Sequence, residues 1–179
     1  MHIVDLADGI DSRVVLPYAE PKSMGKEHTF QQDTADFDYL KDVLRLIAKN
    51  LSLKIRLDGI FAKTVTLKVK YANMKQITRS KSGAAVFRAV DIYHTAAAML
   101  DTVDKRPIRL VGITLSGFTD SDMKQLTLDD MERLGENRRR EALDDALLAL
   151  QRKYGGGIIK TGDEMIAEKR FATKDEPGE

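Results

Sequence analysis

The segment from 59 to 90 holds seven basic residues and no acidic residue, which makes it the strongest candidate for binding chemistry in this sequence. Its basic residues are Lys63, Lys68, Lys70, Lys75, Arg79, Lys81 and Arg88. The 179-residue chain as a whole has 29 basic and 28 acidic residues, so the imbalance is local. Basic side chains without neighbouring acids attract polyanions, and nucleic acid is the commonest large polyanion. An ordinary solvated surface can have the same composition, so both interpretations stay open on charge alone.

Within this segment, residues 63–70 largely alternate between polar and apolar side chains. A period of two is typical of a β-strand with one face against a core. The apolar residues, expected on the buried face, are Val65, Leu67 and Val69. The polar residues, expected on the other face, are Thr64, Thr66, Lys68 and Lys70. The alternation therefore predicts a sheet face of lysine and threonine without carboxylates to neutralise it.

Two shorter motifs could also bind a partner. Thr78-Arg79-Ser80 places a guanidinium between two hydroxyls, a combination suited to adjacent phosphates. Gln125-Leu126-Thr127-Leu128 follows a polar stretch and offers two apolar anchors with one amide, which suits a peptide that docks in a groove. For this second motif, spacing alone favours a simpler interpretation, the first turn of a helix packed on its own domain.

The residue types that carry most enzymatic chemistry form no convincing site in this sequence. The paired acids, Asp36 with Asp38 and Asp120 with Asp122, fall at a predicted helix start and in a polar turn, where acids are common. The three histidines lack the spacing of metal ligands. The absence of cysteine excludes disulfides, thiolate metal sites and thiol nucleophiles, and it fits a reducing cytoplasm. No apolar run reaches membrane-spanning length, so no membrane partner is expected.

The elements that would position these residues are predicted in the order strand, helix, strand, strand, helix, strand. The predicted strands cover 22–31, 61–71, 74–82 and 108–115, with a tight connection at Ala72-Asn73. The first helix starts near 33–36 and has apolar residues at helical spacing as far as Leu51, and the second runs from Val86 to Leu100. This order predicts an α+β fold: a four-stranded, mostly antiparallel sheet with two helices on one face, the other face being open.

Four segments are more informative together than any one alone: 22–30 (KSMGKEHTF), 63–71 (KTVTLKVKY), 76–80 (QITRS) and 106–113 (RPIRLVGI). In this order they resemble the C-terminal little finger of Y-family translesion DNA polymerases, with the bacterial DinB or polymerase IV type as the nearest subgroup. The resemblance spans roughly residues 3–160.

The resemblance implies binding of primer-template DNA without sequence preference, because the family's little finger lays its sheet along the major groove and contacts phosphates of both strands. The residues that match phosphate-contacting segments are Lys22, Ser23, Lys26, Thr29, Thr78, Arg79 and Ser80. Lys68 and Lys70 are added to this set from the charge pattern alone.

The resemblance also reverses the interpretation of Gln125-Leu126-Thr127-Leu128, because a peptide of this kind docks on the replicative sliding clamp in the family. Asp129 stands where many members have an aromatic anchor, which predicts weaker clamp binding. The implied domains are the end of a thumb with a linker at 1–21, the little finger at 22–118, a linker with the clamp-binding peptide at 119–134, and a C-terminal extension at 135–179. The extension is expected to hold a helix at about 137–154 and a frayed tail from 169.

The family's palm, whose acids bind catalytic Mg²⁺, and its fingers would lie upstream of residue 1. The resemblance therefore predicts a C-terminal fragment without polymerase activity of its own, and no catalytic residue, metal ligand or cofactor in this chain. The parent protein would be an error-prone DNA-directed DNA polymerase of the bacterial cytoplasm, associated with the nucleoid and acting in lesion bypass. An alternative from another class is a stand-alone module whose basic sheet face binds RNA or an acidic protein.

Overall fold

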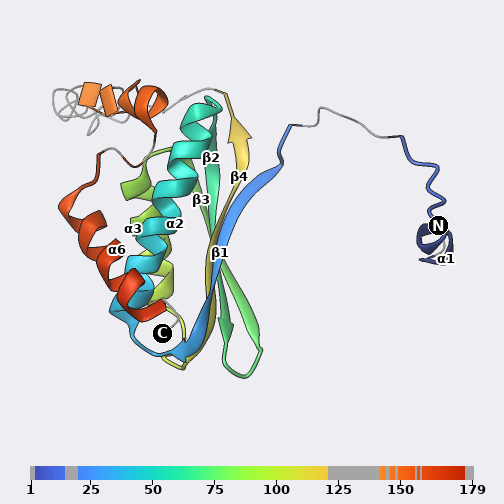
Figure 1. The fold of residues 1–179 in the computed structure, drawn as a ribbon, viewed down its shortest axis with the longest axis horizontal. Helices are drawn as coiled ribbons and strands as arrows, with labels where there is room; N and C mark the ends of the chain where they lie inside the picture. The colour runs from blue at the N-terminus through green and yellow to red at the C-terminus, as the bar shows by residue number, and fades with distance from the viewer. Residues whose placement is uncertain are drawn as a thin grey trace.

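The computed structural model describes residues 3–14, 20–120, 142–143, 146–147, 149–155, 157 and 159–175. Its elements (Figure 1) are, in chain order, α1 (Ile3–Ala7), β1 (Ser23–Thr34), α2 (Phe37–Leu57), β2 (Phe61–Tyr71), β3 (Gln76–Val86), α3 (Ala89–Leu100), β4 (Ile108–Thr119) and α6 (Gly162–Asp175). From β1 to β4 this is the predicted order of strands and helices. No helix in the described parts is both long and apolar enough to cross a membrane.

The four strands form one sheet in the order β1-β4-β2-β3, and every neighbouring pair is antiparallel. Figure 1 shows α2, α3 and α6 together on one side of this sheet. The side that these three helices leave uncovered is called the open face below. The predicted α+β fold class is therefore confirmed.

The core lies between the sheet and the helices, and the sequence explains both of its sides. On β2, Val65, Leu67 and Val69 are buried, as the alternation predicts. On α2, apolar residues recur every three or four positions and form one buried stripe. The stripe consists of Leu40, Leu44, Ile47, Leu51 and Ile55. This helix begins where predicted, because Asp36 Oδ1 accepts a 3.0 Å hydrogen bond from the Tyr39 amide at the N-cap.

The hairpin between β2 and β3 is longer than the predicted two-residue connection. The Tyr71 amide donates a 2.9 Å hydrogen bond to the Lys75 carbonyl, and Met74 within the turn has a positive φ of 67°. Val86, which the sequence assigned to the second helix, is the last residue of β3, so α3 begins later than predicted. Strands β1 and β4 also continue past their predicted ends at 31 and 115. Element types were thus predicted better than element boundaries.

The helix predicted at about 137–154 is helical at every position described, namely 142–143, 146–147 and 149–154. Gly155 ends it with a left-handed φ of 93°, and its amide donates a 2.9 Å hydrogen bond to the Gln151 carbonyl. Glycine favours this conformation because it has no Cβ to clash with the backbone.

The predicted frayed tail is wrong for residues 169–175, because α6 forms there and packs against α2. Ala167 is fully buried, and Phe171 packs on the edge of the core, with its ring centroid 4.9 Å from that of His28 on β1. Arg170 Nη1 lies 3.0 Å from Oδ2 of Asp42, a largely buried carboxylate on α2. Apolar burial and a charged contact together make α6 part of the folded domain.

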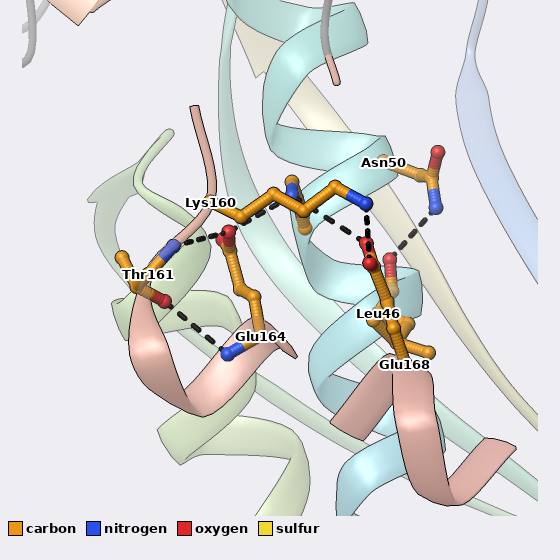
Figure 2. Close-up of polar contacts among 7 residues, drawn as sticks. Leu46, Asn50, Lys160, Thr161, Glu164 and Glu168 are labelled. Atoms are coloured by element: carbon orange, nitrogen blue, oxygen red, sulfur yellow. Dashed lines mark hydrogen bonds and ion pairs between the residues drawn. The ribbon is translucent and has the colours of Figure 1, made fainter. Parts of the chain in front are cut away.

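The first turn of α6 is fixed by a capping box and by an ion pair to α2 (Figure 2). The Glu164 amide donates to Thr161 Oγ1 at 3.3 Å, and the Thr161 amide donates to Glu164 Oε2 at 3.0 Å. The same Oε2 lies 2.8 Å from Lys49 Nζ, and the side chains of Lys49 and Glu164 are only 17% and 16% exposed. Glu168, one turn later, contacts Lys160 and lies 4.0 Å from Lys49. One carboxylate, that of Glu164, therefore both caps α6 and joins it to α2.

The last turn of α6 contacts the start of α2. A hydrogen bond from the Lys174 ammonium, with a second from the Tyr39 amide, lowers the pKa of the Asp36 carboxyl. Because this pKa is lower in the folded state than in the unfolded state, the contact stabilises the fold above the unfolded pKa. The contribution is lost as the pH falls through the folded pKa. Contacts at both ends thus hold α6 along α2.

Candidate nucleic-acid interface

Between the irregular positions of the ladders, the open face has four rows of side chains that cross the sheet from β1 through β4 and β2 to β3. Residues paired across an antiparallel ladder point to the same face, so the register defines each row. The rows are Ser23, Ser116, Thr64 and Ser82; Gly25, Thr114, Thr66 and Ser80; Glu27, Gly112, Lys68 and Thr78; and Thr29, Leu110, Lys70 and Gln76. Most of these residues are glycine, serine or threonine, so the open face is rich in hydroxyls and has few long side chains.

Hydroxyl groups of β2 and β3 hold one another in place on this face. Thr64 Oγ1 and Ser82 Oγ are 2.8 Å apart, and Thr66 Oγ1 and Ser80 Oγ are 2.9 Å apart. A hydroxyl donates one hydrogen bond and accepts others, so each pair keeps the capacity for a further partner. Serine and threonine hydroxyls contact phosphate oxygens without reading base sequence. This part of the face is therefore suited to a nucleic-acid backbone.

The charge of the open face differs from the prediction, because a carboxylate neutralises one of the two lysines in these rows. Lys68 Nζ lies 2.8 Å from Glu27 Oε1 and 2.9 Å from Glu27 Oε2. Glu27 is on β1, outside the acid-free segment, and the sheet brings it to Lys68 across the intervening β4. The second lysine, Lys70, is half-buried in the next row. The predicted absence of carboxylates from this face is therefore wrong.

Two of the predicted basic residues point to the other side of the sheet. Lys26 pairs with Ile113, and Arg79 pairs with Leu67, so both share the face that carries the core. They are nevertheless exposed, because they lie on the outer strands β1 and β3, where the helices do not bury them. The predicted DNA-binding residues are therefore divided between the two faces of the sheet and do not share one surface. The period of two places Arg79 and Lys68 on opposite faces.

β3 is an outer strand whose side chains are exposed on both faces from 78 to 84. Thr78 and Ser80 point to the open face, whereas Arg79 and Lys81 point to the side of the helices. A partner lying along this edge could therefore meet hydroxyls on one side and cations on the other. The three residues of the motif Thr78-Arg79-Ser80 therefore lie together at the edge of the sheet, with the guanidinium on the opposite side from the two hydroxyls.

The remaining predicted residues lie at the opposite edge. Lys22, Ser23 and Thr29 are exposed on β1 or just before it. Since β4 and β2 separate β1 from β3, the two edges are three strand spacings apart, or about 14 Å. Apart from Lys68 and Lys70 on the inner strand β2, the predicted DNA-binding residues therefore lie along the two edges of the sheet.

Sequence reasoning missed three residues that shape the open face: Glu27, Gly25 and Gly112. A Cβ on Gly112 would lie 2.5 Å from Glu27 Cγ and 3.1 Å from the Lys26 carbonyl oxygen, so the glycine leaves room that Glu27 fills. A Cβ on Gly25 would lie 2.7 Å from Thr114 Oγ1. The available signal was glycine inside a strand, which often marks a close approach of a neighbouring group.

In the described parts of the chain, no group of three or more histidine, cysteine, aspartate or glutamate side chains is placed to hold a metal ion. The predicted clamp-binding peptide and its neighbour lie outside the described residues. They are Gln125, Leu126, Thr127, Leu128 and Asp129. The predicted DNA-binding residues, in contrast, all lie within the described part.

Comparison with known proteins identifies related sequences for most of the chain. Residues 21–128 match the family described as the impB/mucB/samB family C-terminal domain. The chain is also similar to the DNA polymerase IV of Dehalococcoides mccartyi, with 31% identity over 165 residues that cover 90% of this chain and 41% of that protein. The chain therefore spans about two-fifths of the length of this curated relative.

Solved structures show a similar fold. A Y-family DNA polymerase chimera gives a TM-score of 0.51 at 18% identity, covering 66% of this chain and 34% of the chimera. The little finger domain of PolIV, solved in a complex with the beta-clamp processivity factor, gives a TM-score of 0.47 at 21% identity. That match covers 59% of this chain and 97% of the other. The likeness to the chimera places the fold of this chain with that of a Y-family DNA polymerase domain.

Proposed function

Because this chain belongs to the impB/mucB/samB family C-terminal domains, the little-finger domains of Y-family DNA polymerase IV, we propose that it binds primer-template DNA through its open face and the edges of its sheet. The observation that carries this proposal is the hydroxyl-rich open face, bordered by exposed edge strands that hold Arg79 and Lys26. Hydroxyls and cations of this kind bind phosphates.

The proposed contacts are to the DNA backbone and carry no sequence preference. Threonine, serine, lysine and arginine on these strands offer donors to phosphate oxygens, which are the same at every base pair. A domain that follows a template of any sequence needs this kind of binding. The affinity should then fall steeply with salt, since each phosphate that a cation neutralises releases counterions.

Replacing Arg79 by alanine tests the contribution of the β3 edge. We expect the affinity for duplex DNA to fall by roughly fivefold, on the order of 1 kcal/mol, because one charged phosphate contact is lost. The slope of log affinity against log salt should become shallower by about one, and the loss should be equal on unrelated sequences. Fluorescence anisotropy at two salt concentrations with two duplexes measures all three quantities.

Lys54→Ala is the matched control, because Lys54 is exposed in the last turn of α2, on the side covered by the helices. It removes the same charge away from the proposed interface and should change the affinity much less. Loss of binding on only one of the two DNA sequences would contradict backbone contact. Tighter binding to RNA than to DNA would instead favour an RNA-binding module.

The proposed second partner is the replicative sliding clamp, with the peptide Gln125-Leu126-Thr127-Leu128 as its binding segment. The support is the peptide's sequence, two leucines that can fill an apolar groove and one amide for a polar contact. Replacing Leu126 and Leu128 together by alanine should abolish clamp binding in a pull-down and leave DNA affinity unchanged. Asp129→Phe should tighten clamp binding, because a buried aromatic usually contributes strongly. Unchanged clamp binding by the double variant would remove this assignment.

In a protein of the DNA polymerase IV type, this domain would hold the template while other domains transfer nucleotides. The relative from Dehalococcoides mccartyi is longer than the matched region, which leaves room in such a protein for the domains that carry out this transfer.

A further inference from the structure

We infer that Glu27 competes with DNA phosphate for Lys68 and so limits how tightly the open face binds DNA. This inference rests on the proposed function, because it assigns a role to one acid within the proposed interface. Glu27 is the only carboxylate among the residues of the four rows, all of which lie in the described part of the chain. It sits in the row that also contains Lys68 and Thr78.

The ion pair joins two strands that are not neighbours. Glu27 is on β1 and Lys68 on β2, and both pair with Gly112 on the β4 strand between them. Two strand spacings separate β1 from β2, or about 10 Å. Both oxygens of the carboxylate approach the ammonium, at 2.8 and 2.9 Å, so the two side chains meet above the glycine.

Gly112 makes this arrangement possible. A Cβ at this position would lie 2.5 Å from Glu27 Cγ, which means that the Glu27 side chain occupies the space above the glycine backbone. The carboxylate therefore lies beside the ammonium, in the row next to the one that contains Thr114, Thr66 and Ser80. A phosphate that contacts the hydroxyls of this neighbouring row would also approach the Glu27 carboxylate.

The pair is suited to exchange. The Lys68 and Glu27 side chains are 27% and 38% exposed, and ion pairs with this much solvent access are weak. Lys68 can therefore leave the carboxylate for a phosphate, but Glu27 then lies unpaired beside that phosphate and repels it. The result is a contact that forms and breaks easily, which suits a domain that must move along DNA.

The test is Glu27→Gln, which keeps the size of the side chain and removes its charge. DNA binding should become tighter, and the slope of log affinity against log salt should become steeper by about 0.9, because Lys68 becomes fully available to one phosphate. That slope predicts an additional loss of roughly three- to fourfold between about 50 and 200 mM salt. Lys68→Ala should weaken binding more in the Glu27→Gln background than in the native chain, by roughly two- to fivefold.

Asp101→Asn is the matched control, because Asp101 forms a similar ion pair with Lys41 on the helix side, at 2.8 Å. It changes the net charge equally and should leave the salt slope as it is. If the native chain binds DNA and Glu27→Gln behaves like Asp101→Asn, the inference is wrong and the proposed function stands. If the native chain does not bind DNA at low salt, the proposed function fails and the inference with it. If Glu27→Gln only lowers thermal stability, the pair serves the fold alone and the inference is overturned.

Discussion

Replacing Gly112 by alanine should lower the free energy of unfolding by about 1–3 kcal/mol, because the new methyl group has no space. Its Cβ would lie 2.5 Å from Glu27 Cγ, 3.1 Å from the Lys26 carbonyl oxygen and 3.2 Å from Glu27 Cα. Two of these three atoms are backbone, so β1 itself would have to shift away from β4. The same substitution should also displace the Glu27 side chain from Lys68.

This expected loss of stability is opposite to the usual effect, since replacing glycine by alanine within a strand ordinarily raises the free energy of unfolding by about 0.5–1 kcal/mol. Gly83→Ala is the matched control, because a Cβ at Gly83 on the exposed strand β3 meets nothing within 4 Å. Urea unfolding of the two variants measures both free energies. A Gly112→Ala variant as stable as Gly83→Ala would show that β1 and β4 are not as close as described.

Replacing Glu164 by alanine should destabilise the domain by about 2–3 kcal/mol and release α6 from α2. The capping box contributes on the order of 1 kcal/mol. Loss of the carboxylate also leaves Lys49, which is only 17% exposed, without its 2.8 Å partner, at a further cost of about 1–2 kcal/mol. Urea unfolding measures the first effect, and faster hydrogen exchange at the α6 amides measures the second.

Glu168→Ala separates these causes from a general loss of negative charge on α6. Glu168 is 4.0 Å from Lys49 and otherwise contacts Lys160, in a pair whose side chains are 39% and 36% exposed. Exposed pairs of this kind contribute about 1 kcal/mol or less, so this variant should keep α6 in place. Equal destabilisation by the two alanine variants would argue against the dual role of Glu164.

The fold was predictable because its signals are local. The alternation at 63–70 identified the buried face of β2, and the spacing of apolar residues identified α2. The C-terminal helix α6 was missed even though Thr161 and Glu164 have the spacing of a capping box. Its apolar side is sparse, with Ala167 and Phe171 as its main contacts, and composition alone therefore favoured a frayed tail.

The candidate interface was less predictable, because its charge depends on which strands become neighbours. An acid-free segment of sequence is not an acid-free surface: Glu27 reaches Lys68 only through the order β1-β4-β2. The opposite orientations of Arg79 and Lys68 follow from the β2–β3 register, which places Arg79 beside Leu67. A hairpin turn two residues long and one slightly longer differ little in sequence, yet the turn fixes that register.

The docking of α6 means that the chain returns to the same folded body after it leaves β4. β4 ends at Thr119, and α6 begins at Gly162 and packs against α2. Whatever lies between these two points is fastened at both ends. A protease that cuts once in this interval would yield two fragments on a denaturing gel but a single particle on a sizing column.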